Sequence, residues 1–203
     1  MKVCFYIANL SGGGAERVFL NLANYLAQED VEVNFVVNEK KGPYLKLLLP
    51  TIPVHELASV HSRGSAFELA AYLNKHKPDI AVSTLSQCNY ALLFARIFSK
   101  EKPVIIVREA NSFLTKRKGL SKSRLIYERL KVGLIYRFAD IMLVNSEGSR
   151  NELAIAGKLN RKNIRILKNP LNIEDMKHQA KAELPDKIST FLKGNPFVVA
   201  VGR

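Results

Sequence analysis

Seven short apolar runs, separated by longer stretches, constrain the fold of this chain more than any other feature. The runs are rich in β-branched residues and mostly apolar on both faces, which is typical of parallel strands covered by helices. After the first run, apolar residues from Ala15 to Leu26 recur at helical spacing. This alternation predicts an α/β fold, a Rossmann-like, doubly wound and mostly parallel sheet with helices on both faces. The predicted strands span residues 3–8, 31–37, 52–57, 79–83, 104–107, 140–144 and 164–167.

The alternation ends at an Asn-Pro pair, residues 169–170. A polar and charged stretch follows, and one more apolar run occupies residues 197–201. A strand placed there has nothing left to pair with in its own domain. We therefore expect a Rossmann-like domain over residues 1–168, an interdomain linker over 169–195, and the first strand of an absent domain over 196–203.

The chain is strongly basic, with 31 Lys and Arg residues against 18 Asp and Glu and a formal net charge of +13. This balance favours an anionic partner: a phosphorylated ligand, an acidic membrane surface or nucleic acid. A solvated basic face is the alternative. The cysteines, Cys4 and Cys88, suggest neither a disulfide framework nor a metal knuckle, which indicates a reducing compartment. No apolar run approaches the length of a membrane-spanning helix, and the first run is interpreted as a strand and not as a signal peptide.

A run of glycines separates the first predicted strand from the first predicted helix, at Gly12, Gly13 and Gly14. In an open α/β sheet, ligands bind beyond the carboxyl ends of the strands, and a helix N-terminus attracts anions. Glycines let a phosphate or sugar approach the backbone, so we predict a substrate-binding loop, with Arg17 as an anion contact. A flexible turn is the alternative. A dinucleotide fingerprint is disfavoured because its third glycine would fall on Arg17, and no G-K-[ST] of a P-loop follows.

Four stretches of the chain resemble motifs of the family-4 glycosyltransferases, which have the GT-B fold. The segment GGGAER and the helix after it are similar to the family's first loop, G-G-x-x-x-x-R. Residues 136–157, YRFADIMLVNSEGSRNELAIAG, resemble its ADxxxxxS strand and the following helix. Residues 163–176, NIRILKNPLNIEDM, resemble its hinge strand, and FVVAVGR at 197–203 resembles the first strand of its second domain. The order and spacing of the four agree over essentially the whole chain.

The resemblance implies a two-domain enzyme with its active site between two Rossmann-like domains. This chain is then the N-terminal, acceptor-binding half, inactive alone. The C-terminal half, which binds the nucleotide sugar and carries the family's E-x7-E motif, is its missing partner. The implied reaction is a retaining, metal-independent transfer from a nucleotide sugar, usually UDP-linked, with no cofactor and no metal site. In the VGR stretch, Arg203 is the implied contact with the donor phosphate.

Polar residues after the fourth and fifth predicted strands complete the candidate site. Thr84 and Ser86 are expected to hydrogen-bond sugar hydroxyls, although Ser86 is equally suited to cap a helix. Arg108 and Asn111 are expected at the same sheet edge, as substrate-binding residues. Glu109 is the candidate catalytic residue, orienting an acceptor hydroxyl or stabilising positive charge in the transition state; an ordinary ion pair is the alternative. Many family members carry a histidine-containing motif here, whereas this chain has VREANSF.

Positive charge is concentrated between residues 108 and 137, where nine Lys or Arg and two Glu give +7 of the +13. Cations mixed with aromatic and aliphatic residues suit an anionic membrane surface, with a solvated charge run as the alternative. The helix from Ser121 carries more than one apolar stripe, and we expect much of it to be buried against the sheet. The membrane contact is therefore predicted in the preceding loop, at Lys116, Arg117, Lys118 and Lys122.

This basic loop makes a glycolipid or polyprenyl-phosphate-linked saccharide a sensible acceptor. The protein is then expected to be cytoplasmic and peripherally associated with the inner face of the cytoplasmic membrane. Two other classes of function stay open on the sequence alone. Another Rossmann-type nucleotide-dependent enzyme, such as a dehydrogenase, is opposed by Arg17 in place of glycine. A basic nucleic-acid-binding module is suggested by charge but lacks a recognition motif, so no nucleic-acid partner is expected.

Overall fold

The computed structural model describes residues 1–59, 61, 64–171, 173–183, 186–192 and 198. The chain divides into two compact units, Met1–Pro170 and Leu171–Arg203. Apart from Val198, the strand predicted over residues 196–203 lies outside the described residues. The predicted domain boundaries therefore stay predictions. The helices of the second unit are α6 (Ile173–Gln179) and α7 (Asp186–Leu192).

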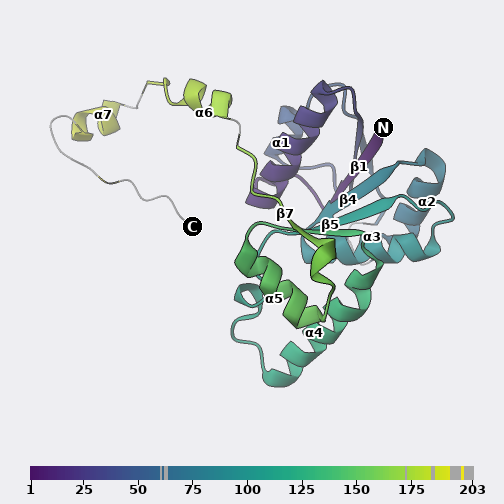
Figure 1. Cartoon of the computed structure of the whole chain (residues 1–203). Coiled ribbons are helices and arrows are strands. Elements are labelled where there is room, and N and C mark those ends of the chain that lie inside the picture. Colours follow the sequence, from purple (N-terminus) through teal and green to yellow (C-terminus); the bar gives the residue numbers. More distant parts are fainter. Residues whose placement is uncertain (60, 62–63, 172, 184–185, 193–197, 199–203) are drawn as a thin grey trace. The chain divides into compact units, whose positions relative to one another are not determined.

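All seven predicted strands form, and they make one sheet in which every neighbouring pair is parallel (Figure 1). The strand order is β3-β2-β1-β4-β5-β6-β7. The prediction of a Rossmann-like α/β sheet is thus confirmed, with a fully parallel arrangement instead of a mostly parallel one. The strands are β1 (Lys2–Ile7), β2 (Glu32–Val37), β3 (Val54–Glu56), β4 (Ile80–Thr84), β5 (Val104–Glu109), β6 (Ile141–Val144) and β7 (Ile164–Ile166).

The strand order reverses between β1 and β4, at the centre of the sheet. From β1 the chain continues to β2 and β3 on one side, and it then crosses to β4 on the other side. At such a switch point the connections leave toward opposite faces of the sheet and open a crevice at the carboxyl ends of the strands. The loop that contains Gly12 follows β1, and Thr84 ends β4. The topology therefore places the predicted glycine loop at the crevice.

The core consists of two hydrophobic clusters, which belong to opposite faces of the sheet. On the face of α1, the Phe5 ring packs on Phe19 and Phe35, with ring centroids 5.1 and 5.4 Å apart. On the other face, the helices α2 to α5 bury residues such as Leu92 and Leu153. The prediction of helices on both faces is confirmed (Figure 1). The helices are α1 (Gly14–Gln28), α2 (Ala66–His76), α3 (Ser86–Phe98), α4 (Lys122–Ile135) and α5 (Glu147–Gly157), with the short 3-10 turns η1 (Pro43–Leu47), η2 (Thr115–Arg117) and η3 (Tyr136–Phe138).

Side chains of β5 alternate between the two faces, and this alternation sets up the site. Ile105 is fully buried on the face of α3, whereas Val104 is 43% exposed and Ile106 half-buried on the face of α1. By the same alternation, Arg108 points to the face of α1 and Glu109 to the face of α3. Two consecutive residues at the end of one strand therefore serve different sides of the sheet.

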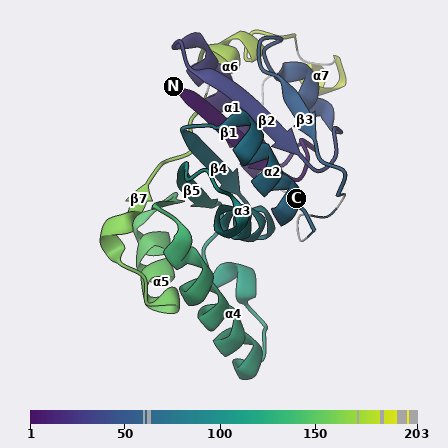
Figure 2. The ribbon, with the colours of Figure 1, turned by 90° about the vertical axis from the view of Figure 1, so that its right-hand side faces the viewer.

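Helices α4 and α5 lie side by side and approach closely at two buried glycines (Figure 2). A Cβ atom on Gly133 would lie 2.5 Å from the carbonyl oxygen of Gly157, which is backbone and cannot rotate away. We expect Gly133→Ala to lower the free energy of unfolding by ~1–3 kcal/mol, because overpacking outweighs the better helix propensity of alanine. Urea unfolding measures this change.

The matched control is Gly148→Ala, also in a helix, where the nearest heavy atom to an added Cβ lies at 3.9 Å. This variant is expected to be as stable as the wild type or more stable. A Gly133→Ala protein that unfolds at the wild-type urea concentration would show that the helices separate without cost.

Candidate functional site

The glycine loop forms one wall of the candidate site. Its three glycines differ in backbone conformation and in the space around them. Gly12 has φ +104°, a backbone conformation that L side chains rarely adopt. Gly13 has φ −80° and ψ 165°, which is extended backbone open to any residue. A Cβ on Gly14, the first residue of α1, would meet no heavy atom within 4 Å. The backbone therefore requires glycine at position 12, whereas position 14 faces open space.

A pocket of about 360 Å³ lies at the switch point, and Gly14 is one of the residues that line it. Four predicted substrate-binding residues line it together, namely Gly13, Gly14, Arg108 and Asn111. Sequence reasoning missed Asn169, which also lines the pocket, although its position before the proline that ends the alternation was a usable signal. The remaining lining residues are Ala15, Glu16, Leu85 and Ala110.

Arg108 brings a buried positive charge to this pocket. The residue is 2% exposed, and its guanidinium donates hydrogen bonds to Thr84 Oγ1 at 3.3 Å and to Asn169 Oδ1 at 2.6 Å. Burial lowers the pKa of Arg108 and the adjacent Glu109 opposes that shift. An arginine nevertheless keeps its proton in a protein. The guanidinium is held by two neutral oxygens and, with the N-terminus of α1, brings positive charge to a pocket that the Glu16 carboxylate also lines.

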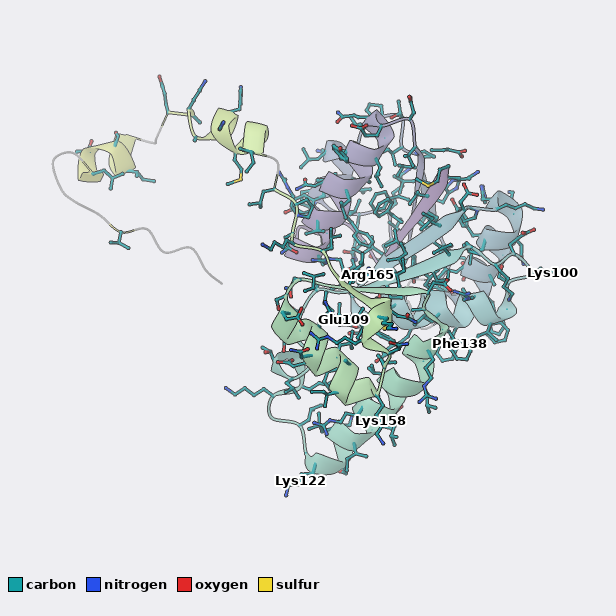
Figure 3. All side chains as sticks on the ribbon, in the orientation of Figure 1. Lys100, Glu109, Lys122, Phe138, Lys158 and Arg165 are labelled. Atoms are coloured by element: carbon teal, nitrogen blue, oxygen red, sulfur yellow. The ribbon has the colours of Figure 1, made fainter. Side chains whose placement is uncertain are left out.

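Glu109, labelled in Figure 3, is not among the residues that line this pocket and is bonded into a network of buried side chains. Its Oε1 accepts hydrogen bonds from the Tyr136 hydroxyl and from Asn89 Nδ2, and its Oε2 accepts one from Ser86 Oγ at 3.3 Å. Burial raises the pKa of Tyr136, which keeps the phenol protonated as a donor. These contacts suit a positioning residue that fixes the start of α3. The catalytic role predicted for Glu109 stays a prediction.

The two hydroxyl residues predicted to bind sugars are both buried. Thr84 is 0% exposed and supports the Arg108 guanidinium, so the structure gives it an indirect role instead of the predicted contact with a sugar. Ser86 is the first residue of α3, whose N-cap is Leu85, so the alternative of a capping serine is wrong. Ser86 donates to Glu109 and borders a second, larger cavity.

The larger cavity is a groove of about 700 Å³ between α3 and α4. Aromatic rings and cations alternate along it: Lys131 Nζ lies 3.9 Å from the centroid of the Tyr90 ring, and the Arg124 guanidinium lies 5.3 Å from that of Tyr127. Flat rings with hydrogen-bonding groups beside them are suited to hold a polar ring such as a sugar. The groove lies beside α3 and α4, whereas the smaller pocket lies at the start of α1. The remaining lining residues are Ser86, Gln87, Ala91, Phe94, Arg117, Leu120, Glu128 and Ile135.

Arg17 lies apart from the residues that line the smaller pocket. It belongs to the first turns of α1, and its guanidinium carbon stands 5.5 Å from the centroid of the Tyr44 ring. Tyr44 in turn donates a hydrogen bond to the carbonyl oxygen of Gly12 at 3.3 Å. Arg17 is thus connected to the glycine loop through the Tyr44 ring. Its predicted contact with an anion stays a prediction. Arg203, the predicted donor-phosphate contact, lies outside the described residues.

The basic loop before α4 corrects one of the predicted membrane contacts. Arg117 is 8% exposed; its guanidinium carbon lies 3.9 Å from the centroid of the Phe113 ring, and Nη2 lies 3.3 Å from Glu128 Oε2. A side chain held in this way is not available to a membrane. Lys118 and Lys122 are exposed as predicted. For Lys116 the structure describes only the backbone, which belongs to η2.

Helix α4 is also less buried than the sequence predicted. Its apolar residues Ile126, Leu130 and Leu134 point to the outside, and its inward side is formed by residues such as Val132. Periodicity identifies which residues share a face but not which face a neighbouring helix covers. Among the described residues, no helix is both long enough and apolar enough to cross a membrane.

Comparison with known proteins gives a family match over most of the chain. The family model described as Glycosyltransferase Family 4 matches residues 12–175. A curated relative from Campylobacter jejuni is 25% identical over the full chain and is named N-acetylgalactosamine-N,N'-diacetylbacillosaminyl-diphospho-undecaprenol 4-alpha-N-acetylgalactosaminyltransferase. A second protein of that organism, named as an alpha-1,4-N-acetyl-D-galactosaminyltransferase acting on a GalNAc-containing PP-undecaprenol saccharide, is 33% identical over 58% of this chain and 35% of its own.

Solved structures agree on the fold. HepE from Anabaena in complex with UDP has 20% sequence identity and a TM-score of 0.64, over 89% of this chain and 50% of its own. The lipopolysaccharide outer core galactosyltransferase WaaB has 19% identity and a TM-score of 0.61, over 85% of this chain and 47% of its own. The chain likewise spans 55% of the length of the first Campylobacter relative. The matched proteins are thus about twice as long.

Proposed function

The chain belongs to glycosyltransferase family 4, and from that premise we propose that it is the acceptor-binding half of a retaining glycosyltransferase. The proposed enzyme moves a sugar from a nucleotide donor, UDP-linked, to a lipid-linked saccharide. Support for the acceptor class comes from the two Campylobacter relatives, whose names specify saccharides carried on undecaprenol diphosphate. The length of the relatives supports a C-terminal, donor-binding half as the partner of this chain.

The observation that carries this proposal is the convergence of Arg108 and the open N-terminus of α1 on one pocket. Sugar transfer from a nucleotide donor leaves a phosphate behind, so negative charge develops on the leaving group. A buried guanidinium and unpaired helix N–H groups stabilise such charge without reorganising, because both are held in place before the reaction. In this proposal, the smaller pocket faces the reacting phosphate and sugar, and it needs neither a metal nor a cofactor.

The larger groove takes the acceptor in this proposal. Tyr90 and Tyr127 line the groove with aromatic rings over which Lys131 and Arg124 lie, and these two cations offer positive charge to an acceptor diphosphate. Glu109 holds the start of α3 by accepting a hydrogen bond from Ser86, which lines the groove. The donor-binding half then closes over both cavities and excludes water from the transfer. Because its acceptor is embedded in lipid, the enzyme works at the inner face of the cytoplasmic membrane, as a cytoplasmic and peripherally bound protein.

The test is a transfer assay with the polypeptide that carries this chain and its C-terminal half. We expect sugar transfer from a UDP-linked donor to a diphospho-polyprenol saccharide, with the anomeric configuration of the donor retained in the product as read by NMR. Residues 1–203 without the C-terminal half are expected to transfer no sugar and to show no tight binding of UDP in calorimetry. Micromolar binding of UDP or of NAD to this chain would show that the domain roles are wrong, and an inverted product would refute the retaining mechanism.

A further inference from the structure

A row of exposed apolar side chains runs along the outer side of α4. Ile126, Leu130 and Leu134 are 57%, 61% and 62% exposed. On the neighbouring helix α5, Ile155 is 76% exposed. Together they line a depression of about 430 Å³ whose floor is formed where α4 and α5 meet at Gly133 and Gly157. We call this surface the α4–α5 face; its residues are Ile126, Arg129, Leu130, Leu134, Arg137, Ile155 and Lys158.

Every charged residue that lines this depression is a cation. Arg129 lies on α4 beside the apolar row, and Arg137 lies in η3 directly after α4. Lys158, labelled in Figure 3, is the C-cap of α5 on the opposite rim. All three are exposed. Apolar side chains that reach outward between cations match the boundary of an anionic bilayer, where acyl chains lie directly below phosphate groups.

We propose that the α4–α5 face docks onto a membrane surface that carries anionic lipid, with its apolar row among the acyl chains and its cations at the phosphates. The inference rests on the proposed function, because a lipid-embedded acceptor places the enzyme at a membrane. It moves the main contact from the loop at Lys118 to the outer side of α4.

A second copy of the chain fits this surface poorly. An isologous contact would bring each face onto its own copy, so Arg129, Arg137 and Lys158 would meet the same cations of the other chain. Like charges brought together without a counter-charge destabilise the contact, whereas lipid phosphates supply the missing negative charge.

Docking through α4 also explains how the acceptor reaches its groove. The same helix separates the two cavities: Leu130 and Leu134 face the depression, while Tyr127 and Lys131 line the acceptor groove. Placing the outer side of α4 in the headgroup region therefore holds the groove at the level where a lipid-linked diphosphate emerges from the bilayer. A lipid-linked substrate then enters without leaving the membrane.

The experiment is sedimentation of the chain with two kinds of vesicle, phosphatidylcholine alone and phosphatidylcholine mixed with phosphatidylglycerol. We expect binding to the anionic vesicles that weakens with salt. Each surface cation strengthens membrane binding by roughly fivefold, so Arg129→Gln, Arg137→Gln and Lys158→Gln together should weaken it about 100-fold. Leu130→Ser with Leu134→Ser and Ile155→Ser should weaken it at least about tenfold. The matched control replaces exposed apolar residues of α2 and α3, Phe67→Ser with Ile97→Ser and Phe98→Ser, and should bind like the wild type.

A fluorescent reporter locates the contact directly, because the chain contains no tryptophan. Leu130→Trp is expected to shift its emission to the blue on anionic vesicles and to be quenched by brominated acyl chains, whereas Phe67→Trp should do neither. Equal shifts at both positions, or a wild-type chain that ignores anionic vesicles, would overturn the proposal. So would dimerisation in ultracentrifugation that the serine variant abolishes, because a second copy would then cover the face. Vesicle binding by a polypeptide that transfers no sugar would refute the proposed function and leave the α4–α5 face standing.

Discussion

Gly14→Val should abolish most of the glycosyl transfer while leaving the fold intact. The added Cβ meets no heavy atom within 4 Å and Gly14 lines the pocket, so we expect the valine methyl groups to enter the pocket and not the core. They would occupy the space beside Arg108 that a phosphate or sugar needs, and a displacement of about 1 Å at a reacting group costs on the order of 100-fold in rate. Transfer by the polypeptide with both halves measures the loss, and urea unfolding of the same protein shows that stability is retained.

Two further variants separate a blocked pocket from a damaged loop. Gly14→Ala adds one carbon and is expected to lose less activity than Gly14→Val. Gly12→Ala should act through stability, because a side chain at φ +104° stores strain of ~1–3 kcal/mol. If Gly14→Val folds normally and keeps wild-type transfer, the glycine loop is a turn, and the pocket has no part in the reaction.

The strands and the position of the candidate site were predictable, because both depend on local pattern and on a general rule of α/β sheets. Runs of β-branched residues such as 31–37 have few alternatives to a buried strand. Once the sheet is parallel, the carboxyl ends of its strands form one edge, and Gly14 and Arg108 must lie near it. The family match also decides against the dehydrogenase alternative.

Which partner each polar side chain finds was not predictable, because those partners are distant in sequence. Arg108 and Glu109 are adjacent, yet strand alternation sends one to Asn169 and the other to Tyr136. Arg117 resembles its neighbouring lysines in sequence, but Phe113 and Glu128 bury it. Such choices are made by tertiary packing, which a pattern of residue types does not encode.

Arg108→Met is expected to lower transfer by roughly 10- to 100-fold, the effect of losing a charge-assisted hydrogen bond. Methionine keeps much of the apolar stem and removes only the charge, so the pocket wall is preserved. Arg108→Lys should recover part of the loss, because an ammonium keeps the charge but not the planar fork that reaches Thr84 and Asn169 together. Steady-state kinetics with varied donor and acceptor shows which substrate the charge serves.

The matched control is Arg165→Met on β7, an exposed arginine of the same sheet, which should transfer like the wild type (Figure 3). Asn169→Ala tests the support of the guanidinium: it removes the 2.6 Å hydrogen bond but keeps the charge, so its effect should be smaller than that of Arg108→Met. If the Met variant folds and transfers sugar at the wild-type rate, the Arg108 guanidinium has only a structural role, which is to hold β5 to Asn169 by a hydrogen bond. The anion would then have to be held elsewhere, and the convergence of Arg108 with the start of α1 would no longer support a transferase site.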